Sequence, residues 1–223
     1  HMGSDLSVVN SARVSFGKKS AMVCTDHQLG TYELKEGDKR LIRYLAKHKH
    51  ISPFGHCFAS FHVKAPIFVA RQLVKHKFLR WNEISRRYVD DEPEFYVPDV
   101  WRGRSEDKKQ GSSNTAVEFL RMQGFGEQSV NDGAFKHQMH SLDLYRDMIS
   151  AGVAPEQARM VLPQSTMTEW YWSGSLDAFA AMCRLRCASD TQYESRVVAD
   201  QISIIMEGLY PVSWKALMKG ETK

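Results

Sequence analysis

The 223-residue chain is 43% hydrophobic and 25% charged, a composition that excludes a disordered segment and suffices to bury one full core. Its formal net charge of +4 suits anionic small molecules and is weak evidence for nucleic-acid binding on its own. No run of residues approaches the roughly 18 apolar residues of a membrane span, and no signal peptide is recognisable.

The four cysteines predict a reducing compartment. None forms a C-x-x-C pair, and Cys183 and Cys187 are four residues apart, the spacing of one helix face rather than of a zinc ribbon. We therefore expect free thiols in a cytoplasmic protein. The chain begins with His1 rather than Met, which suggests a tag remnant or a truncated start.

The N-terminal part is predicted to hold two helices. Residues 4–16 place apolar side chains at helical spacing after Ser4 or Asp5, either of which is a candidate N-cap. A second helix over residues 38–50 starts at the candidate N-cap Asp38. The side chains that we expect this helix to bury are Leu41, Ile42 and Leu45.

The next part is predicted to combine loops with one strand and one helix. Residues 27–38 are typical of a loop. Residues 57–65 alternate between apolar and polar side chains, which predicts a half-buried strand. A helix over residues 66–77 begins with Pro66, a residue that suits a first helical turn. The long polar stretch 90–114 is predicted to be a mobile or ligand-binding loop.

A long helix is predicted over residues 115–150, with a break near Gly124 and Gly126. The apolar residues that we expect on one side of it are Phe135, Met139, Leu142 and Met148.

The C-terminal part completes the prediction. Residues 154–163 form a short helix that stops before a proline, and residues 165–175 are rich in the Thr, Trp and Tyr of a strand. Residues 175–189 and 192–209 are predicted helices. The fold class is therefore α+β, helix-rich with a small sheet that contains antiparallel strands, and we expect residues 1–223 to form a single domain.

A basic segment follows the helix that begins with Pro66. Gln72, Lys75 and His76 lie within one helical turn of each other. Lysine and arginine are natural phosphate ligands, so this segment could form the wall of a phosphate pocket. The alternative is a solvated basic face, which the apolar rings of Phe78 and Trp81 argue against.

Two further arginines lie among apolar residues. On its predicted helix, Arg186 shares one side with Phe179, Met182 and Cys183. A charge beside an apolar stripe needs a partner unless the side chain reaches the edge of the stripe. Arg159 lies in a mostly apolar helix, and its residue pattern alone favours a structural ion pair.

Other chemistries lack their signatures. Nine histidines suggest a metal, yet none forms a recognisable ligand pattern with the cysteines, and we predict no metal site. No Ser-His-Asp order, G-x-G-x-x-G or P-loop is present, and no cysteine lies in a nucleophile context.

Residues 50–88 resemble the signature region of the flavin-dependent thymidylate synthases. The hallmark of that family is Arg-His-Arg, seven residues and then Ser, and this chain has Lys75-His76-Lys77, seven residues and then Ser85. Residues 4–16 resemble the family's N-terminal helix and residues 151–186 its C-terminal half. The remaining matches to the longer signature and to positions that the family uses are Asn82, Glu83, Arg87, Tyr88, Arg159 and Arg186.

The resemblance implies a chemistry and an assembly. The enzyme would make dTMP from dUMP with a methylene group from methylenetetrahydrofolate, a hydride from reduced FAD, and NADPH to reduce the flavin again. It would use no cysteine nucleophile. The fold would be that of the thymidylate synthase complementing proteins, assembled as a homotetramer with sites shared between subunits, and neither a nucleic acid nor a membrane would be a partner.

The resemblance also implies roles for particular residues. Arg186 would be catalytic, because its charge beside the uracil ring favours the N3-deprotonated form and raises the electron density at C5. The residues implied for dUMP are Gln72, Lys75, Glu83, Ser85, Arg86, Arg87, Arg159 and Arg186. The residues implied for FAD are Ser52, Lys75, His76, Lys77, Asn82, Glu83 and Ser175.

The departures from the family pattern concern the flavin and folate side. Lys75 and Lys77 replace both hallmark arginines and lose the bidentate guanidinium fork, so flavin affinity is expected to fall. The other departures are Gly55, Arg80, Ser175 and Ala181, and the short strand that usually precedes the N-terminal helix is missing.

Three alternatives remain open. A related flavin enzyme could transfer a hydroxymethyl group instead of a methyl group to the pyrimidine. A folded paralogue without flavin would have no activity. A nucleic-acid-binding module could use Phe78 and Trp81 as stacking platforms, although a cluster of acidic residues opposes that interpretation. This cluster comprises Glu83, Asp90, Asp91 and Glu92.

Overall fold

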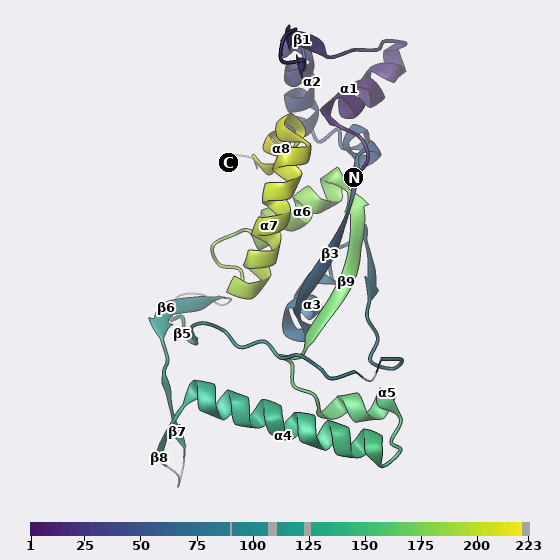
Figure 1. Ribbon diagram of the computed structural model, residues 1–223. Helices are drawn as coiled ribbons and strands as arrows, with labels where there is room; N and C mark the ends of the chain where they lie inside the picture. Colours follow the sequence, from purple (N-terminus) through teal and green to yellow (C-terminus); the bar gives the residue numbers. More distant parts are fainter. Residues whose placement is uncertain (90, 107–110, 123–125, 220–223) are drawn as a thin grey trace.

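The computed structural model describes residues 1–89, 91–106, 111–122 and 126–219. A three-stranded antiparallel sheet in the order β3–β9–β4 lies in the middle of the molecule (Figure 1). Its strands are β3 (Phe58–Pro66), β9 (Met167–Ser175) and β4 (Leu79–Glu83). Phe58 pairs with Ser175 at one end of the sheet, and Glu83 pairs with Trp170 towards the other.

The period-2 pattern of β3 and β9 divides the sheet into two faces. Trp170 and Trp172 are each 1% exposed on the inner face, whereas Tyr171 between them is 59% exposed. The ring of Trp81 on β4 stacks on Trp170, with centroids 4.3 Å apart. Burial of 150–250 Å² by each ring at about 25 cal/mol/Å² corresponds to about 4–6 kcal/mol of transfer free energy per tryptophan.

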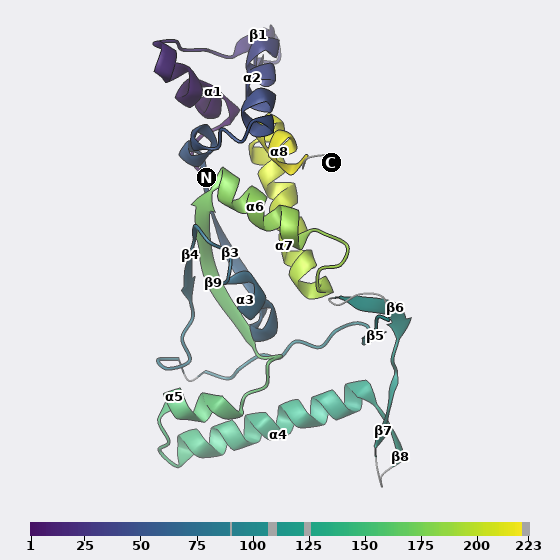
Figure 2. The ribbon, with the colours of Figure 1, turned by 180° about the vertical axis from the view of Figure 1, so that it is seen from behind.

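Helices cover the inner face and one end of the sheet. α3 (Ile67–Leu73) lies along the sheet, and α6 (Leu176–Arg186) leads from the end of β9 to α7 (Tyr193–Leu209) (Figure 2). The remaining elements beyond that end of the sheet are α1 (Asp5–Arg13), η1 (Val14–Phe16), β1 (Val23–Asp26), β2 (Thr31–Glu33), α2 (Glu36–Lys47), η2 (Ser52–His56) and α8 (Pro211–Met218). The buried side chains of the helices and the sheet form one hydrophobic cluster.

The other end of the molecule carries α4 (Val130–Ser150), which lies across the foot of the sheet in Figure 1. Gln138 of α4 is 5% exposed and donates to the Tyr96 carbonyl and to Ser165 Oγ, both over 3.1 Å. The neighbouring elements are β5 (Arg102–Arg104), β6 (Ser112–Ala116), β7 (Phe119–Met122), β8 (Gly126–Ser129), α5 (Pro155–Ala158) and η3 (Arg159–Val161).

Most of the helices and strands that were predicted from a regular hydrophobic pattern are confirmed. The predicted strands 57–65 and 165–175 are β3 and β9, and the α+β class with an antiparallel sheet is correct. The first helix begins at Asp5 after Ser4. The expected missing strand before it is reduced to one bridge, in which Met2 and Phe58 exchange two backbone hydrogen bonds. Whether the chain forms a single domain stays a prediction.

The predicted N-cap Asp38 is wrong. α2 begins at Glu36 after Lys35, and Asp38 is 1% exposed inside its first turn. Its carboxylate accepts hydrogen bonds from Arg13 and Ser20, which lie far away in sequence. Asp38 therefore resembles a local N-cap in the sequence, but in the structure it forms an ion pair with a distant residue.

The predicted helix over residues 115–150 is also wrong in its first half. Residues 115–129 contain the end of β6 and the strands β7 and β8, and the helix starts only at Val130. Gly126 has φ +78° and begins β8, whereas Gly124 lies outside the described residues. Phe135, expected on the same side of the helix as Leu142, is 58% exposed, whereas Leu142 is buried.

Smaller differences concern loops and ends. The expected loops 27–38 and 90–114 contain β2, β5 and the start of β6, while residues 90 and 107–110 lie outside the description. The predicted helix 66–77 ends at Leu73, and β4 follows where no strand was predicted. In the described part of the chain, no helix has the length and apolar character needed to cross a membrane.

Candidate active site

The C-terminal ends of α3 and α6 bring together Gln72, His76 and Arg186. Arg186 Nε donates to His76 Nε2 over 2.9 Å, and Arg186 Nη2 donates to the Gln72 carbonyl over 3.4 Å. The chain leaves this corner through Phe78, a non-glycine residue with φ +65°, and then enters β4. Such a backbone conformation is costly for a residue with a side chain, and it is common at functional sites.

The hydrogen bond fixes the protonation state of His76. Since Nε2 accepts from Arg186, the ring has to be neutral. Burial and then the charge of Arg186 lower the pKa of His76 from 6.5 to about 4. Burial also lowers the pKa of Arg186. At neutral pH the pair therefore carries the single positive charge of the guanidinium.

Gln72 is held from a second side by the first turns of α7. Its Nε2 donates to Gln192 Oε1, and its Oε1 accepts a hydrogen bond of 3.0 Å from Ser195 Oγ. Ser195 is fully buried. Sequence analysis missed both partners, although their spacing of three residues at a helix start puts them on one helix face.

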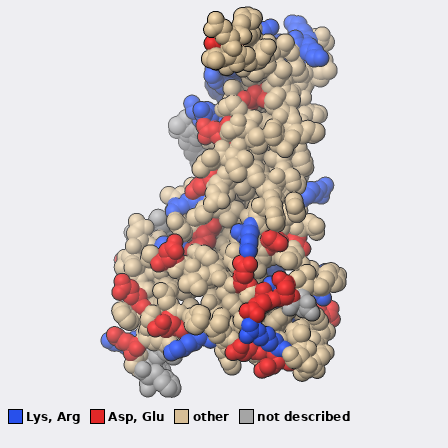
Figure 3. Space-filling view, viewed as in Figure 1, with Lys and Arg blue, Asp and Glu red and all other residues tan. Residues whose placement is uncertain are grey.

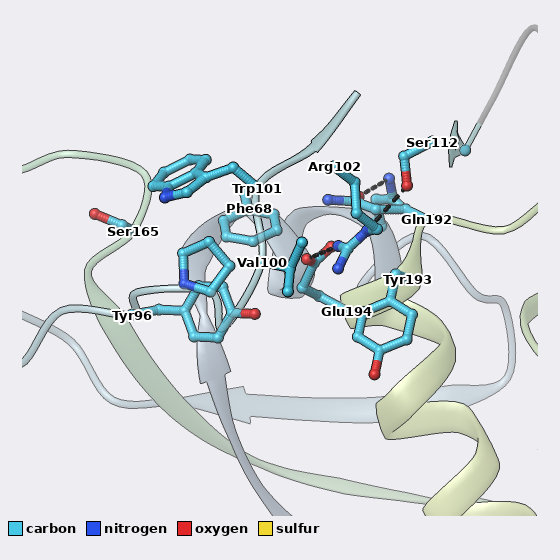
Figure 4. A pocket seen from close by; sticks show the side chains of 13 residues that line it. Phe68, Tyr96, Val100, Trp101, Arg102, Ser112, Ser165, Gln192, Tyr193 and Glu194 are labelled. Atoms are coloured by element: carbon cyan, nitrogen blue, oxygen red, sulfur yellow. Dashed lines mark hydrogen bonds and ion pairs between the residues drawn. The ribbon is translucent and has the colours of Figure 1, made fainter. Parts of the chain in front are cut away.

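A cavity of about 610 Å³ adjoins Gln72 (Figure 4). We call it the hairpin cavity, because the β5–β6 hairpin forms part of its wall. The residues that define it are Phe68, Tyr96, Trp101, Arg102, Tyr193 and Glu194, with Gln72 and Gln192 beside them. Tyr96, Trp101 and Arg102 lie where a loop was predicted, so the cavity was not foreseen.

A second group of predicted ligands lies at the far end of β4. Glu83 accepts from Trp81 Nε1 over 3.0 Å and from Thr168 Oγ1 over 2.7 Å. Ser85 Oγ accepts from Arg87 Nε over 3.1 Å, and Arg86 Nη1 donates to the Asp91 carbonyl over 2.7 Å.

The two groups are separated along the strand. His76 precedes Leu79, whereas Ser85 follows Glu83, and the four steps between these strand ends span about 13 Å at roughly 3.3 Å per residue. The predicted nucleotide ligands therefore do not converge within one chain.

Arg159 lies apart from both groups. It is exposed at the start of η3, and its Nε donates to the Glu156 carbonyl over 3.2 Å. The ion pair expected from its residue pattern is not among the contacts of the described residues, which show this carbonyl as its partner. The guanidinium thus has donors free for an anionic ligand.

The predicted flavin ligands are also divided. Ser175 pairs with Phe58, just after η2 with its first residue Ser52, and Gly174 pairs with Leu79, just after Lys77. These residues share one end of the sheet. The others, Asn82 and Glu83, lie towards the opposite end of β4.

Gly55 in η2 faces Asp177, which follows Ser175 in the chain. A side chain at Gly55 would meet only Asp177 Oδ1, 3.9 Å away. Among the described residues, this buried carboxylate oxygen has no hydrogen-bond partner. An unsatisfied buried oxygen suits a ligand that carries hydroxyl or amine groups.

The face of the molecule seen in Figure 3 carries no continuous basic patch. On the face seen in Figure 3, acidic and basic side chains are intermingled over the lower half instead of forming one basic patch. A continuous basic surface is the usual footprint of such a module.

Comparisons with known proteins identify the family. The model of the thymidylate synthase complementing protein family matches residues 1–212. The flavin-dependent thymidylate synthase of Thermus thermophilus is 38% identical over 220 residues, which cover 96% of this chain and 72% of the relative. That of Thermosipho africanus is 36% identical over 220 residues, which cover 98% of this chain and 88% of the relative.

Solved structures agree with this result. The UMP/dUMP methylase PolB from Streptomyces cacaoi, bound with 5-Br dUMP, superposes with a TM-score of 0.71 at 30% identity. The match covers 96% of this chain and 90% of that chain. The chain belongs to the thymidylate synthase complementing protein family, whose curated members above are flavin-dependent thymidylate synthases, and it is therefore an enzyme.

Proposed function

We propose that this enzyme converts dUMP to dTMP, with methylenetetrahydrofolate as carbon donor, FAD as cofactor and NADPH as reductant. The observation that carries the proposal is the Arg186–His76 pair, a guanidinium fixed by a neutral imidazole at a family position. The names of the relatives and the 5-Br dUMP in the PolB structure support the substrate.

Arg186 has the catalytic role. Its half-buried guanidinium stabilises negative charge on a uracil ring that has lost the N3 proton, and this charge raises the electron density at C5. Because His76 and the Gln72 carbonyl hold the guanidinium in advance, little reorganisation is needed when the charge develops.

The nucleotide is held by residues from both groups. Gln72 contributes beside Arg186, and Arg159 contributes from its separate position at the start of η3. Charged donors suit the phosphate, and a serine hydroxyl completes the set. Lys75 contributes from the end of β4 where His76 lies, and the ligands from the other group are Glu83, Ser85, Arg86 and Arg87.

The division into two groups supports an oligomer. A ligand that contacts both Arg186 and Arg87 needs them on facing surfaces, and the ends of β4 keep them apart in one chain. A second copy supplies the missing group at each site. We expect the homotetramer with sites at subunit interfaces that the family resemblance implies.

The residues present fit a flavin. Lys75 and Lys77 are exposed cations for a diphosphate, and Asp177 Oδ1 offers an acceptor for a hydroxyl or an amine near Ser52 and Ser175. Bound there with Asn82, Glu83 and His76 of the shared site, the flavin supplies hydride chemistry.

The cysteines support a mechanism without a thiol nucleophile. The four thiols are free. Burial raises the pKa of Cys57 to about 11, and a hydrogen bond with Cys187 together with burial raises the pKa of Cys183. Both stay protonated at neutral pH and are poor nucleophiles.

The second candidate is hydroxymethyl transfer to the same nucleotide. The substitutions at Gly55, Lys75 and Lys77 change the flavin side, where the fate of the methylene group is decided. Mass analysis of the product separates the two, because dTMP alone rejects hydroxymethylation.

The test of the proposed function is a visible absorption spectrum of the purified protein after FAD is added and the excess is removed. Retained flavin bands that shift when dUMP is added support one shared pocket. Bound dUMP without retained flavin would contradict the flavin chemistry and favour a paralogue without enzymatic activity.

A further inference from the structure

Among the residues that α7 buries, one is polar. The buried side chains of this helix are Ser195, Ala199, Ile202 and Met206. A buried hydroxyl group costs free energy unless it forms a hydrogen bond, and alanine would occupy a helical position without that cost. Ser195 Oγ forms its hydrogen bond with Gln72 Oε1 on α3, over 3.0 Å. The hydroxyl group therefore serves Gln72 rather than α7 itself.

Ser195 and Gln192 occupy the two positions whose side chains usually cap a helix. Gln192 is the N-cap residue of α7, and Ser195 is three residues later. In a capping box, the side chains at these positions accept from each other's backbone N–H groups. Among the described residues, the start of α7 shows no such bond, because both side chains turn to Gln72 instead. The helix thereby gives up the stabilisation of a side-chain cap.

The two contacts hold the Gln72 amide at both ends. Its Nε2 donates to Gln192 Oε1, and its Oε1 accepts from Ser195 Oγ. A free glutamine side chain samples many rotamers, and a ligand that binds it loses affinity by ordering it. Here the amide is ordered in advance. Since an amide has two N–H groups and two lone pairs, these contacts leave one donor and one acceptor for a ligand.

The backbone of Gln72 belongs to the corner that holds Arg186. Its carbonyl accepts from Arg186 Nη2 over 3.4 Å, and α3 packs against α7. The guanidinium also donates to His76, so it keeps this partner when the Gln72 side chain is freed. Loss of the amide contacts should therefore change the affinity for the nucleotide more than the rate of the catalytic step.

We propose that Gln192 and Ser195 are positioning residues that order the Gln72 amide for the nucleotide. The proposal rests on the proposed function, in which Gln72 is a ligand of dUMP. It gives a role to two residues outside the signature segment, and they act through Gln72 without touching the nucleotide. In the alternative, a structural role, the same contacts only join α3 to α7, and their loss lowers the stability of the fold.

Gln192→Ser separates the two roles, because they predict opposite changes in stability. Serine is a preferred N-cap residue and is too short to hold the Gln72 amide, so Tm should rise while the affinity for dUMP falls. Calorimetric titration of the FAD-loaded protein with dUMP should show binding about three- to tenfold weaker, the effect of ordering one side chain. A lower Tm with unchanged affinity for dUMP would overturn the proposal.

Ser195→Ala removes the hydroxyl group alone. It should also weaken dUMP binding about three- to tenfold, and it should raise the KM for dUMP while kcat stays nearly unchanged. Ser203→Ala is the matched control, because this serine lies on the same helix and accepts from Trp214 Nε1 over 3.1 Å. It loses one hydrogen bond in the same way, and its affinity for dUMP should stay unchanged.

A double-mutant cycle shows whether the two residues act through Gln72. Gln72→Ala should itself weaken dUMP binding, and in that background neither Ser195→Ala nor Gln192→Ser should weaken it further. A further loss of affinity would overturn the proposal, and so would normal dUMP binding by Gln72→Ala. The cycle measures nucleotide binding alone, so failure of the proposed function is seen separately, as no dTMP from the unaltered protein.

Discussion

Arg186 Nε lies 2.9 Å from His76 Nε2 and donates a hydrogen bond to it, although 110 positions separate the two residues in sequence. The acceptor is a histidine in the signature motif, and the donor is the arginine to which the proposed mechanism assigns catalysis. The motif therefore has a structural task within its own chain, since it fixes the direction of the guanidinium.

The catalytic role of Arg186 predicts the effect of Arg186→Ala. Loss of the positive charge beside the uracil ring should lower kcat by about 100-fold or more, as for other preorganised groups that stabilise developing charge. The rate of dTMP formation under saturating dUMP measures it. Arg184→Ala is the matched control, because that side chain lies on the same helix and donates to the Leu217 carbonyl instead. Normal turnover in Arg186→Ala would remove this residue from the mechanism.

The lowered pKa of His76 predicts a pH dependence of stability. The unfolded chain binds this proton near pH 6.5, whereas the folded chain binds it only near pH 4, so protonation favours unfolding. The contribution is fully present above pH 6.5 and is lost as the pH falls from 6.5 towards 4. The free energy of unfolding in urea should therefore drop less between pH 7 and pH 5 in His76→Gln than in the unaltered protein. Equal drops would show that His76 titrates normally.

Arg159→Ala should weaken dUMP binding about tenfold, the lower end of the about 1.5–3 kcal/mol that a charged hydrogen bond contributes, because this side chain is exposed. Equilibrium binding of dUMP measures the change. Arg43→Ala, an exposed arginine on α2, serves as the control for net charge. Unchanged nucleotide affinity in Arg159→Ala would reject its role.

The two lysines in the hallmark positions predict that their replacement by arginine increases the affinity for FAD. Lys75→Arg and Lys77→Arg together restore two planar forks that bind a diphosphate with paired hydrogen bonds, so the protein should retain more FAD after gel filtration. The ratio of flavin to protein absorbance measures retention. Lys47→Arg, at an exposed helix end, is the control. A lower ratio in the double variant would show that lysine suits this site better than arginine.

The sequence predicted those parts of the fold in which local pattern and burial agree. β3 and β9 bury alternate residues, so their period is visible in the sequence, and α6 and α7 follow their apolar stripes. β5 and β6 are short, and their side chains are partly or fully exposed, so no apolar period marks them. Asp38 looked like a cap because the partners that bury it, Arg13 and Ser20, belong to a distant segment.

The candidate site, like the fold, could be predicted from the sequence only in part. The family resemblance identified Gln72, His76 and Arg186, but the hydrogen bonds among them depend on how α3 and α6 meet, which no spacing encodes. Gln192 and Ser195 support Gln72 through contacts of the same kind. Arg102 and Glu194 lie 92 positions apart, and neither stands out from its neighbours until the hairpin is folded. Long-range packing was therefore the information that the sequence analysis lacked.

The separation of Arg186 from Arg87 along β4 leads to a prediction about mixed oligomers. If each site takes Arg186 from one subunit and Arg87 from another, then Arg186→Ala and Arg87→Ala are each inactive alone. Subunits of the two variants, mixed and allowed to exchange, should regain about a quarter of the unaltered activity, because random pairing in a closed oligomer restores that share of sites. The measurement is dTMP formation after refolding the mixture.

A control mixture of Arg186→Ala with Gln72→Ala should stay inactive, because these two residues lie against each other in one chain. No recovery in the first mixture, with a confirmed exchange of subunits, would mean that one chain assembles the whole site. The end of β4 would then have to move towards α6 when the nucleotide binds. Recovery in both mixtures would instead place Gln72 and Arg186 in different sites, against the hydrogen bond that joins them.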